Sequence, residues 1–553
     1  MNQRLMKREK TVFESALLSL RPPTLACFRG QEGVKACDFK KDDQQRAGFD
    51  FSGSTDKQCL LRADVGNGQA KLVQRVAVLF SGGPAPGGHN VIAGLKALLP
   101  DPHILYGVKA GPKGLLEGDF LELDDEKVAS KLNLGGFDLL GSDRTKIKTE
   151  EQFAQVKDVV QRFSLTALVV IGGDDSNTNA LLLAEALLPL GCKVIGVPKT
   201  IDGDLQVSDL LPISFGFDTA AKVYAELVGN ILQDTPSSRK YWHVVKLMGR
   251  SASHIALEVG LKTKAPVTVI SEAVLANKQR LVDVAQSIAD VVKKRAEFGK
   301  NYGVILLPEG LIEFIPEYQQ LIQNINGVFA RLSTSLEGKD EEKRFELIYA
   351  ALDSDDQDVL DEMPVSVRSA LFKDRDSHGN VQVSQIPTEE LIIHAVRELL
   401  PEAVPFATNT HFFGYEGRCA APSLFDAALT YNLGLCAASL ILAEKTGVMA
   451  AISELDSGGV AYGIPLAALV TTECRDGKDV TVIKKALVDL DSPAYQALVT
   501  FQNEADPCDD HFVHPGPIQF FGDKTLTHTM PETVRLNQGY DVSEFDMGEA
   551  ITG

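Results

Sequence analysis

The sequence predicts a doubly wound α/β fold, and three observations lead to that prediction. Short apolar runs recur from Arg75 onward, and they are rich in Val and Ile without polar alternation, which is typical of strands buried on both faces of a parallel sheet. Segments with helical spacing fall between these runs, and alternating strands and helices indicate doubly wound architecture. Every strong motif stands where such a strand ends, which is where open α/β sheets bind ligands.

The predicted elements follow in order along the chain. Strands are expected at 75–80, 165–171, 193–198, 241–248, 267–270, 302–308 and 448–452. Helices are expected at 177–190, 251–262, 276–297 and 423–445. Residues 1–72 are irregular in pattern, and we expect an N-terminal extension that packs on the main body. Between about 315 and 402 only helical spacing is found, which predicts a helical insertion inside an α/β domain.

Composition favours a cytosolic enzyme and argues against a nucleic-acid binder. The 553 residues are 44% hydrophobic and 24% charged, the balance of a soluble globular protein with two or three domains. We find no uninterrupted apolar stretch of membrane-spanning length and no secretion signal at the start. The net charge of −20 opposes binding to a phosphate backbone, and the eight scattered cysteines are expected to be reduced thiols.

The first motif is SGGPAPGGHN, residues 81–90, between a predicted strand and a helix. Glycines let the backbone approach a ligand closely, and the following helix presents free N–H groups and the positive end of its dipole. These features favour a bound phosphate. A merely tight turn is the alternative, because the loop is neither G-x-G-x-x-G nor the Walker lysine motif.

The second motif is GGDDSN, residues 172–177, at the end of the next predicted strand. Two adjacent carboxylates suit a hard cation that bridges to phosphate oxygens. The alternative is a helix N-cap, in which Asp175 or Ser176 satisfies the free N–H groups of the following helix. Both interpretations can hold together, since a cap uses one side chain and a metal another.

The third motif is PKTIDGD, residues 198–204, again at a strand end. It brings a lysine, a hydroxyl and two carboxylates together in one short loop. Phosphoryl transfer to an alcohol needs a base for the hydroxyl proton, a cation for the developing charge and metal ligands. An Asp-Gly β-turn explains part of this loop but not why Lys and Asp cluster at this edge.

Four further short motifs are LGSDR (140–144), MGR (248–250), PEG (308–310) and GYEGR (414–418). Together with the three loops above, they occur in the order found in the phosphofructokinase family. The chain resembles that family over roughly residues 75–470. The resemblance implies two doubly wound α/β domains of phosphofructokinase type with the active site between them. It implies the following division: N-terminal extension, 1–72; donor domain for diphosphate and Mg²⁺, 73–214, completed by 419–470; sugar-phosphate domain, 215–418, with the insertion; C-terminal segment packing back on the core, 471–553.

The resemblance also implies roles for single residues. Asp202 matches the general base for the sugar 1-hydroxyl, and Asp174 and Asp204 match positions at the Mg²⁺ ion. Donor phosphates are expected at Gly82, Gly83, Arg144 and Ser176. The sugar phosphate is expected at Thr200, Ile201, Asp202, Met248, Gly249, Arg250, Glu309, Tyr415, Glu416, Gly417 and Arg418. Lys240 and Tyr241 match residues that reach a neighbouring subunit's site, which implies at least a dimer, and we expect a homodimer.

Two positions bear on the phosphoryl donor. Relatives that use ATP have glycine where this chain has Asp175 and Lys199. A carboxylate at Asp175 would put bulk and negative charge where the α-phosphate of a nucleotide lies, and like charges repel strongly in a partly desolvated site. Lys199 would stabilise a pyrophosphate leaving group. The pair therefore favours a reversible, Mg²⁺-dependent transfer from diphosphate to fructose 6-phosphate, with Thr200 also touching the sugar.

Two alternatives remain within the same family. One is an ATP-dependent enzyme, and the other is a non-catalytic regulatory subunit, against which the intact TIDGD, GGDD and MGR sequences speak. Sedoheptulose 7-phosphate is a second candidate acceptor. Asp143 departs from the family pattern, because many relatives have a small residue there, and it adds a carboxylate beside the expected phosphate.

Overall fold

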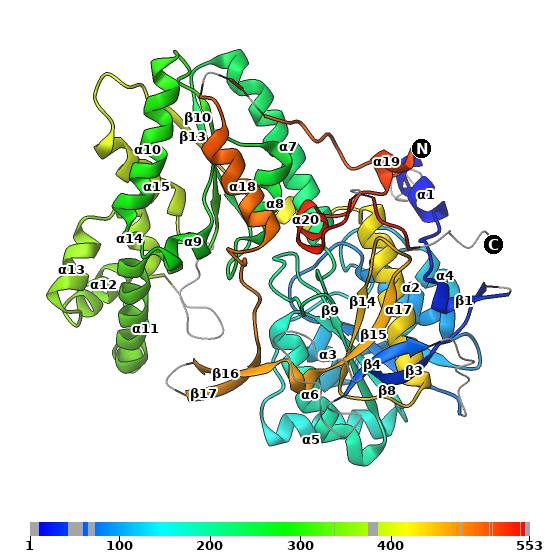
Figure 1. Cartoon of the computed structure of the whole chain (residues 1–553). Helices are drawn as coiled ribbons and strands as arrows, with labels where there is room; N and C mark the ends of the chain where they lie inside the picture. Colours follow the sequence, from blue (N-terminus) through cyan, green and yellow to red (C-terminus); the bar gives the residue numbers. More distant parts are fainter. Residues whose placement is uncertain are drawn as a thin grey trace, which may run out of the picture.

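Two sheets carry the fold, a mixed sheet with a parallel centre and a smaller parallel sheet (Figure 1). The computed structural model describes residues 10–31, 33–42, 59–64, 72–336, 338–373, 385–475, 478–507, 509–510, 512–541 and 544–547.

The larger sheet has nine strands, and its centre is parallel. The order of its strands is β3 (Asp38–Asp42), β4 (Leu60–Asp64), β15 (Val460–Pro465), β14 (Val448–Ser453), β9 (Lys193–Pro198), β8 (Ala167–Gly172), β5 (Arg75–Phe80), β6 (Ile104–Val108) and β7 (Phe120–Glu122). The strands β3, β4, β15 and β7 run antiparallel to their neighbours. Part of the N-terminal extension therefore contributes two strands to the sheet instead of only lying on it.

Helices cover both faces of this sheet, as a doubly wound fold requires. Val76, Val78 and Phe80 of β5 pack with α2 (Gly88–Leu98) and α17 (Leu424–Leu442). The alternate residues of the same strand pack with α5 (Glu150–Arg162) and α6 (Asp174–Leu187) on the other face. Successive strand residues point to opposite faces, so both faces of β5 are apolar and buried.

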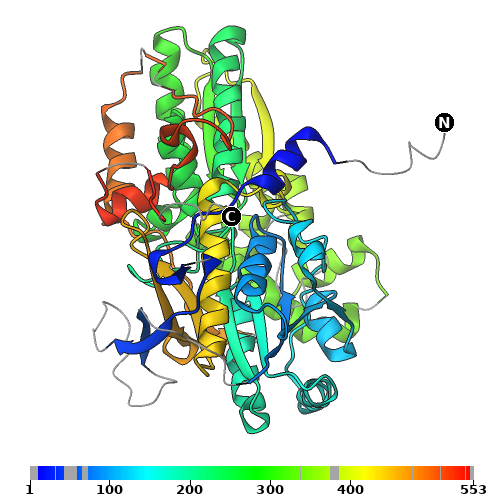
Figure 2. The same cartoon turned by 90° about the vertical axis from the view of Figure 1, so that its right-hand side faces the viewer.

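The helix α17 is long and apolar enough to cross a membrane by length and composition, and 89% of the apolar window is buried inside the protein. It lies along the larger sheet (Figure 2). Its apolar surface is therefore accounted for by packing in the core.

The smaller sheet has four parallel strands in the order β11 (Val267–Thr268), β12 (Gly303–Pro308), β10 (Trp242–Leu247) and β13 (Thr408–Phe413). One face packs against α7 (Phe217–Ser238) and α8 (His254–Thr263). The other face packs against α10 (Leu281–Glu297) and α15 (Thr388–Leu399). This is a second doubly wound unit.

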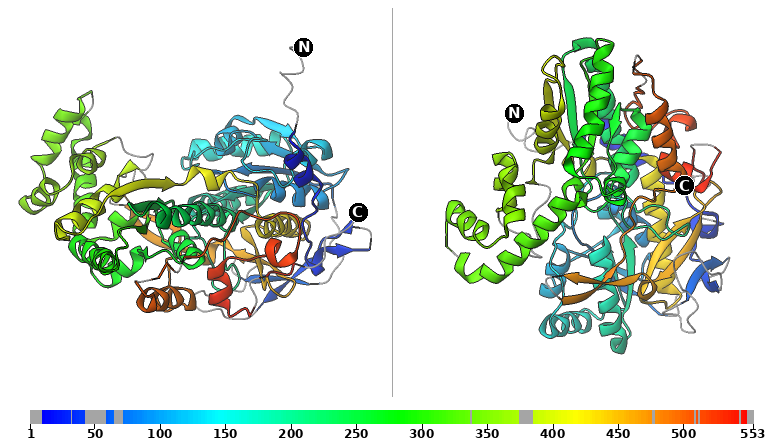
Figure 3. Two further views of the ribbon diagram at one scale, coloured as in Figure 1. Left: turned by 90° about the horizontal axis from the view of Figure 1, so that it is seen from above. Right: turned by 60° about the vertical axis from the view of Figure 1, so that its left-hand side comes forward.

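The helical insertion lies between β12 and β13. It consists of α11 (Pro316–Leu336), α12 (Glu341–Tyr349), α13 (Ser354–Asp361) and α14 (Val365–Leu371), followed by α15. Figure 3 shows these helices extending from the smaller sheet, away from the larger one.

The C-terminal part begins with a hairpin of β16 (Val470–Arg475) and β17 (Lys478–Ile483). The chain then passes to the smaller sheet, where α18 (Pro493–Glu504) packs on α8 and on α20 (Glu532–Gln538).

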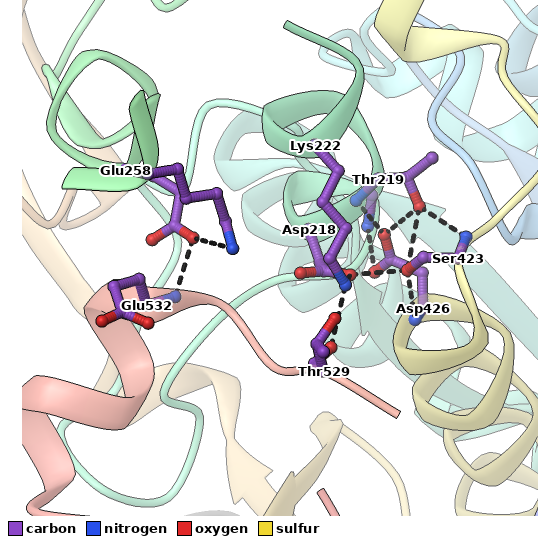
Figure 4. A network of polar contacts seen from close by, with 10 residues as sticks. Asp218, Thr219, Lys222, Glu258, Ser423, Asp426, Thr529 and Glu532 are labelled. Carbon is purple, nitrogen blue, oxygen red and sulfur yellow. Dashed lines mark hydrogen bonds and ion pairs between the residues drawn. The ribbon is translucent and has the colours of Figure 1, made fainter. Parts of the chain in front are cut away.

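A buried polar network ties α7 to α17 (Figure 4). The carboxylate of Asp426 accepts hydrogen bonds from the backbone N–H of Gly216 and Thr219, at 2.8 Å each, and from the Thr219 hydroxyl. Asp218 accepts from Lys222 at 2.6 Å and from Ser423 at 2.6 Å. Buried carboxylates need such partners, and they fix the orientation of α7 relative to α17.

The sequence predicted most strands within one or two residues, and those at 75–80 and 193–198 have the predicted bounds. The helix predicted at 276–297 begins too early. The observed helix is α10, and Ala276 ends a separate helix, α9 (Ser271–Ala276), because the chain turns at Lys278, whose φ is +51°. At the start of α10, the Asp283 carboxylate accepts a hydrogen bond from the Arg280 N–H at 2.8 Å. The strands β3, β4, β6, β7, β13, β15, β16 and β17 were not predicted.

Candidate active site

The motif loops of both sheets come together at one site. β5, β8 and β9 are parallel, so the loops after Phe80, Gly172 and Pro198 emerge at one edge of the larger sheet. The loops after β10 and β12 emerge together from the smaller sheet, since those strands are also parallel. The charges described below interact across the two sets of loops.

Lys199 lies beneath the glycine-rich loop. Its Nζ donates a hydrogen bond to the carbonyl oxygen of Gly83 at 2.9 Å, and the residue is only 7% exposed. Gly82 has a φ of +87°, and a Cβ there would lie 3.3 Å from Nζ, so conformation and space both call for glycine. Burial lowers the pKa of Lys199 to about 8, although the negative charge of Asp202 opposes this shift.

Two guanidinium groups flank the same loop. A Cβ on Gly83 would lie 3.5 Å from Nη1 of Arg418 and 3.7 Å from Nη2 of Arg144. The Nε of Arg418 is buried and makes no hydrogen bond with the described residues. Arg144, predicted for the donor phosphates, therefore lies beside the glycine-rich loop, and so does Arg418, which was predicted for the sugar phosphate.

Asp202 interacts with groups from both sheets. Burial raises the pKa of its carboxyl, and the charge of Glu309 raises it further, while Arg250 and Lys199 oppose the rise. Its backbone N–H donates to Thr200 Oγ1 at 3.1 Å, which holds the turn. Glu309 is 4% exposed and accepts a hydrogen bond from the Gly249 N–H at 3.0 Å. An aspartate with a raised pKa is suited to act as a base near neutral pH.

Asp174 and Asp204 stand next to Asp202. Burial raises the pKa of Asp204 to about 6, and the charges of Asp202 and Asp174 add to the rise. Among the described residues no group of three His, Cys, Asp or Glu side chains is arranged to hold a metal. Mg²⁺ is commonly held by one or two carboxylates together with substrate phosphates and water, so this pair of mutually repelling carboxylates fits the ion.

Asp175 lies in the first turn of α6, where the positive end of the helix dipole favours a carboxylate. Its Oδ1 is 2.9 Å from Nζ of Lys146. The next residue, Ser176, donates from Oγ to Ser81 Oγ at 2.8 Å, which links this helix start to the first loop. The structure gives no side-chain N-cap bond for this helix, so the capping alternative is not observed for Asp175 or Ser176.

Asp143 has a local structural role. Its Oδ1 accepts from the Thr145 N–H at 2.6 Å, and its carbonyl oxygen accepts from the Gly82 N–H at 3.0 Å. The extra carboxylate therefore stabilises the turn that holds Gly82.

The loop GYEGR is held by a residue that the sequence did not suggest. Tyr224 of α7 donates from its hydroxyl to the Gly414 carbonyl oxygen at 2.6 Å, and a Cβ on Gly417 would lie 2.6 Å from its ring. Glu416 accepts from the Gly414 N–H at 2.8 Å, and Tyr415 is 63% exposed, with the Arg418 guanidinium 4.4 Å from its ring centroid.

Lys240 and Tyr241 are not brought to this site. They precede β10, whereas Met248, Gly249 and Arg250 follow it. Six residues of strand separate the two ends by about 20 Å. Tyr241 is 37% exposed on the surface of the protein.

Two lysines that were not predicted also contact carboxylates of the site. Lys146 pairs with Asp175, and Lys485 lies 3.7 Å from Asp174 Oδ2. Neither stands in a motif, and lysine in a polar segment is ordinarily a solvated side chain. Only the tertiary structure brings them to the carboxylates.

Cations gathered around a glycine-rich turn, with a desolvated aspartate nearby, suit the movement of a phosphoryl group onto a hydroxyl. The fold and this arrangement of side chains thus define a phosphotransferase of the α/β class. Comparison with known proteins narrows this class: the model of the family described as phosphofructokinase matches residues 75–441, and the chain belongs to that family.

Curated relatives agree with this assignment. The pyrophosphate–fructose 6-phosphate 1-phosphotransferase of Treponema pallidum is 47% identical, and the match covers 84% of this chain and 83% of the relative. The beta subunit of the enzyme with this name in Solanum tuberosum is 42% identical, with 87% and 85% covered. A pyrophosphate-dependent phosphofructokinase structure from Marinobacter aquaeolei has a TM-score of 0.51 over 78% of this chain and 91% of that chain, at 15% identity, which supports the fold alone. The predicted phosphofructokinase-type fold is confirmed.

Proposed function

We propose that the protein transfers a phosphoryl group from diphosphate to the 1-hydroxyl of fructose 6-phosphate, giving fructose 1,6-bisphosphate and phosphate, in a reversible reaction. The observation that carries this proposal is the placement of Lys199, buried under Gly83 and electrostatically coupled to Asp202. The names of the relatives described above, which cover most of the chain, support the same substrates.

Asp202 takes the proton of the sugar 1-hydroxyl. Its raised pKa makes its carboxylate a stronger base than an ordinary aspartate, and the positive charges of Arg250 and Lys199 favour the ionised form. Lys199 and Arg144 neutralise the charge that develops on the departing phosphate. Thr200, Gly249 and Glu309 lie in the motif loops described above, and there they orient the sugar phosphate.

Asp174 and Asp204 would hold Mg²⁺. When bound, the ion would supply charge neutralisation between the donor phosphates. The chain itself keeps the two carboxylates close together, and the burial of Asp204 limits the access of water to them.

Diphosphate is favoured over ATP because of Asp175. The ion pair with Lys146 fixes its carboxylate at the start of α6, so it cannot swing away from a nucleotide's α-phosphate without breaking that pair. A fixed negative charge in this position rejects a longer phosphate chain by repulsion.

The enzyme acts as a homodimer in the cytoplasm. Lys240 and Tyr241 lie too far from Arg250 of their own chain to share its substrate, so a second copy is needed for them to act. A cytoplasmic location is consistent with the free cysteines among the described residues.

The direct test is the initial rate with fructose 6-phosphate and Mg²⁺, with diphosphate and ATP supplied in parallel reactions. Turnover with diphosphate alone is expected. Turnover with ATP alone would contradict the donor assignment, and absence of turnover with either donor, from folded protein, would favour the regulatory-subunit alternative. Sedoheptulose 7-phosphate is tested as acceptor in the same assay.

A further inference from the structure

A short segment after the hairpin, residues 483–488, passes from the larger-sheet domain to the smaller-sheet domain; we call it the crossing segment. On the large-sheet side, the N–H of Ile483 donates to Thr178 Oγ1 of α6 at 2.9 Å, and the N–H of Ala486 donates to the Asp204 carbonyl oxygen at 2.7 Å. On the small-sheet side, the N–H of Val488 donates to Glu272 Oε1 at 3.0 Å.

Lys485 is the residue of this segment whose side chain enters the candidate active site. Its Nζ donates to Ser251 Oγ at 2.7 Å and lies 3.7 Å from Asp174 Oδ2. Its side chain is 23% exposed, and that of Asp174 is 21% exposed. One ammonium therefore contacts the carboxylate proposed for Mg²⁺ and the hydroxyl that directly follows Arg250.

The charge of Lys485 also acts on the neighbouring carboxylates. It opposes the raised pKa of both Asp202 and Asp204. These acidic groups share a desolvated space, and like charges in such a space need nearby cations to stay ionised.

Anchoring of the C-terminal part does not require this side chain. The backbone N–H groups of Ile483, Ala486 and Val488 make the three hydrogen bonds given above. Shortening the side chain of Lys485 leaves these backbone bonds in place. The contact between the Lys485 ammonium and Asp174, at a separation of 3.7 Å and partly exposed, adds little to the stability of the fold. The position of Lys485 therefore calls for an explanation in terms of the chemistry of the site.

We propose that Lys485 is a positioning residue for phosphoryl transfer: it holds the Asp174 carboxylate and Ser251 at a fixed separation, and adds positive charge where diphosphate binds. The inference rests on the proposed function. It also assigns a role to the crossing segment. Its side chain Lys485 belongs to neither sheet, and it sets the distance between the donor side and the sugar-phosphate side of the site.

The test compares Lys485→Met, which keeps the length of the side chain and removes its charge, with Lys485→Arg, which keeps the charge. The matched control is Lys484→Met, because Lys484 is the adjacent lysine and its side chain is exposed. Each full-length variant is measured for kcat, for KM of both substrates, for thermal midpoint, and for calorimetric affinity for Mg²⁺ with diphosphate in the absence of sugar.

Lys485→Met is expected to lower kcat by about tenfold or more and to weaken binding of Mg²⁺ with diphosphate by a similar factor, at an unchanged thermal midpoint. Lys485→Arg should recover most of both losses, and Lys484→Met should match the wild type. Equal behaviour of the two methionine variants would overturn the inference. So would a loss in Lys485→Met that comes with a lowered thermal midpoint and is not recovered by arginine.

The wild-type measurement separates this inference from the proposed function. Wild-type protein that neither binds nor turns over diphosphate would contradict both. Wild-type turnover together with an unimpaired Lys485→Met variant would contradict only the role of Lys485.

Discussion

Nζ of Lys146 lies 2.9 Å from Oδ1 of Asp175, so the carboxylate at the start of α6 is held by a cation from a different loop. The two residues are separated by the whole of α5 and β8 in the chain. Asp175 therefore has a defined position on the donor side of the site. Its effect on donor choice can be tested by one variant that removes the carboxylate and a second variant that removes only Lys146.

Asp175→Gly should admit ATP. Removing the carboxylate removes both bulk and repulsion, and a gain of about tenfold or more in kcat/KM for ATP is expected, with a loss for diphosphate. Parallel kinetics with the two donors measure the change. Lys146→Met is the control, because it breaks the ion pair but keeps the carboxylate, and it should still exclude ATP. Unchanged exclusion in Asp175→Gly would show that another group rejects the nucleotide.

Asp202→Ala should abolish most turnover without unfolding the protein. Loss of a general base costs roughly 10²–10⁴-fold in kcat. The change is read from kcat at saturating substrates and from the thermal midpoint of the same sample. Asp209→Ala, an exposed aspartate on the same connection between β9 and α7, is the control and should be as active as the wild type. Substantial activity in Asp202→Ala would remove Asp202 from the proposed role.

Activity should depend on pH through Lys199. Its pKa in the substrate-free protein is lowered to about 8, so the ammonium is present below that pH and is lost above it. Because kcat/KM reports on the free enzyme, kcat/KM for diphosphate should fall as pH rises through about 8.

Lys199→Arg separates this effect from the ionisation of diphosphate itself. Arginine stays charged over the whole range, so whatever activity the variant has should lack the alkaline decline assigned to Lys199. An identical decline in both proteins would assign it to the substrate or to another residue.

Some residues of the candidate site could be predicted from the sequence alone, and others could not. The loops around Lys199 and Asp202 were predictable, because buried parallel strands are locally patterned and their ends carry the motif residues. Lys146, Tyr224 and Lys485 were not, since each reaches the site from a distant segment and has no local pattern that distinguishes it from other polar residues. The same limit applies to β13, which pairs with β10 far earlier in the chain, and to β15, whose second partner β4 comes from the N-terminal extension.

Stability should respond oppositely to Gly→Ala at two helix positions. A Cβ on Gly434 of α17 would lie 2.2 Å from the Val91 carbonyl oxygen of α2, so alanine forces the two helices apart and should cost about 1–3 kcal/mol. Gly327 of α11 has nothing within 4 Å of a built Cβ, and alanine there should add about 0.5–1 kcal/mol. Urea midpoints measure both. Destabilisation by both variants would contradict the close helix contact as the cause.

Subunit complementation should reveal the shared site. Lys240→Ala and Asp202→Ala are each expected to be nearly inactive as homodimers, because every site lacks one of the two residues. In a mixed dimer, one site has both defects and the other has neither. Co-expression with two affinity tags and purification of the mixed species should therefore recover roughly half of the wild-type activity per dimer. If Lys240 acted within its own chain, each site of the mixed dimer would keep one defect, and no activity would return. That outcome would also contradict the roughly 20 Å separation along β10 as the reason for a dimer.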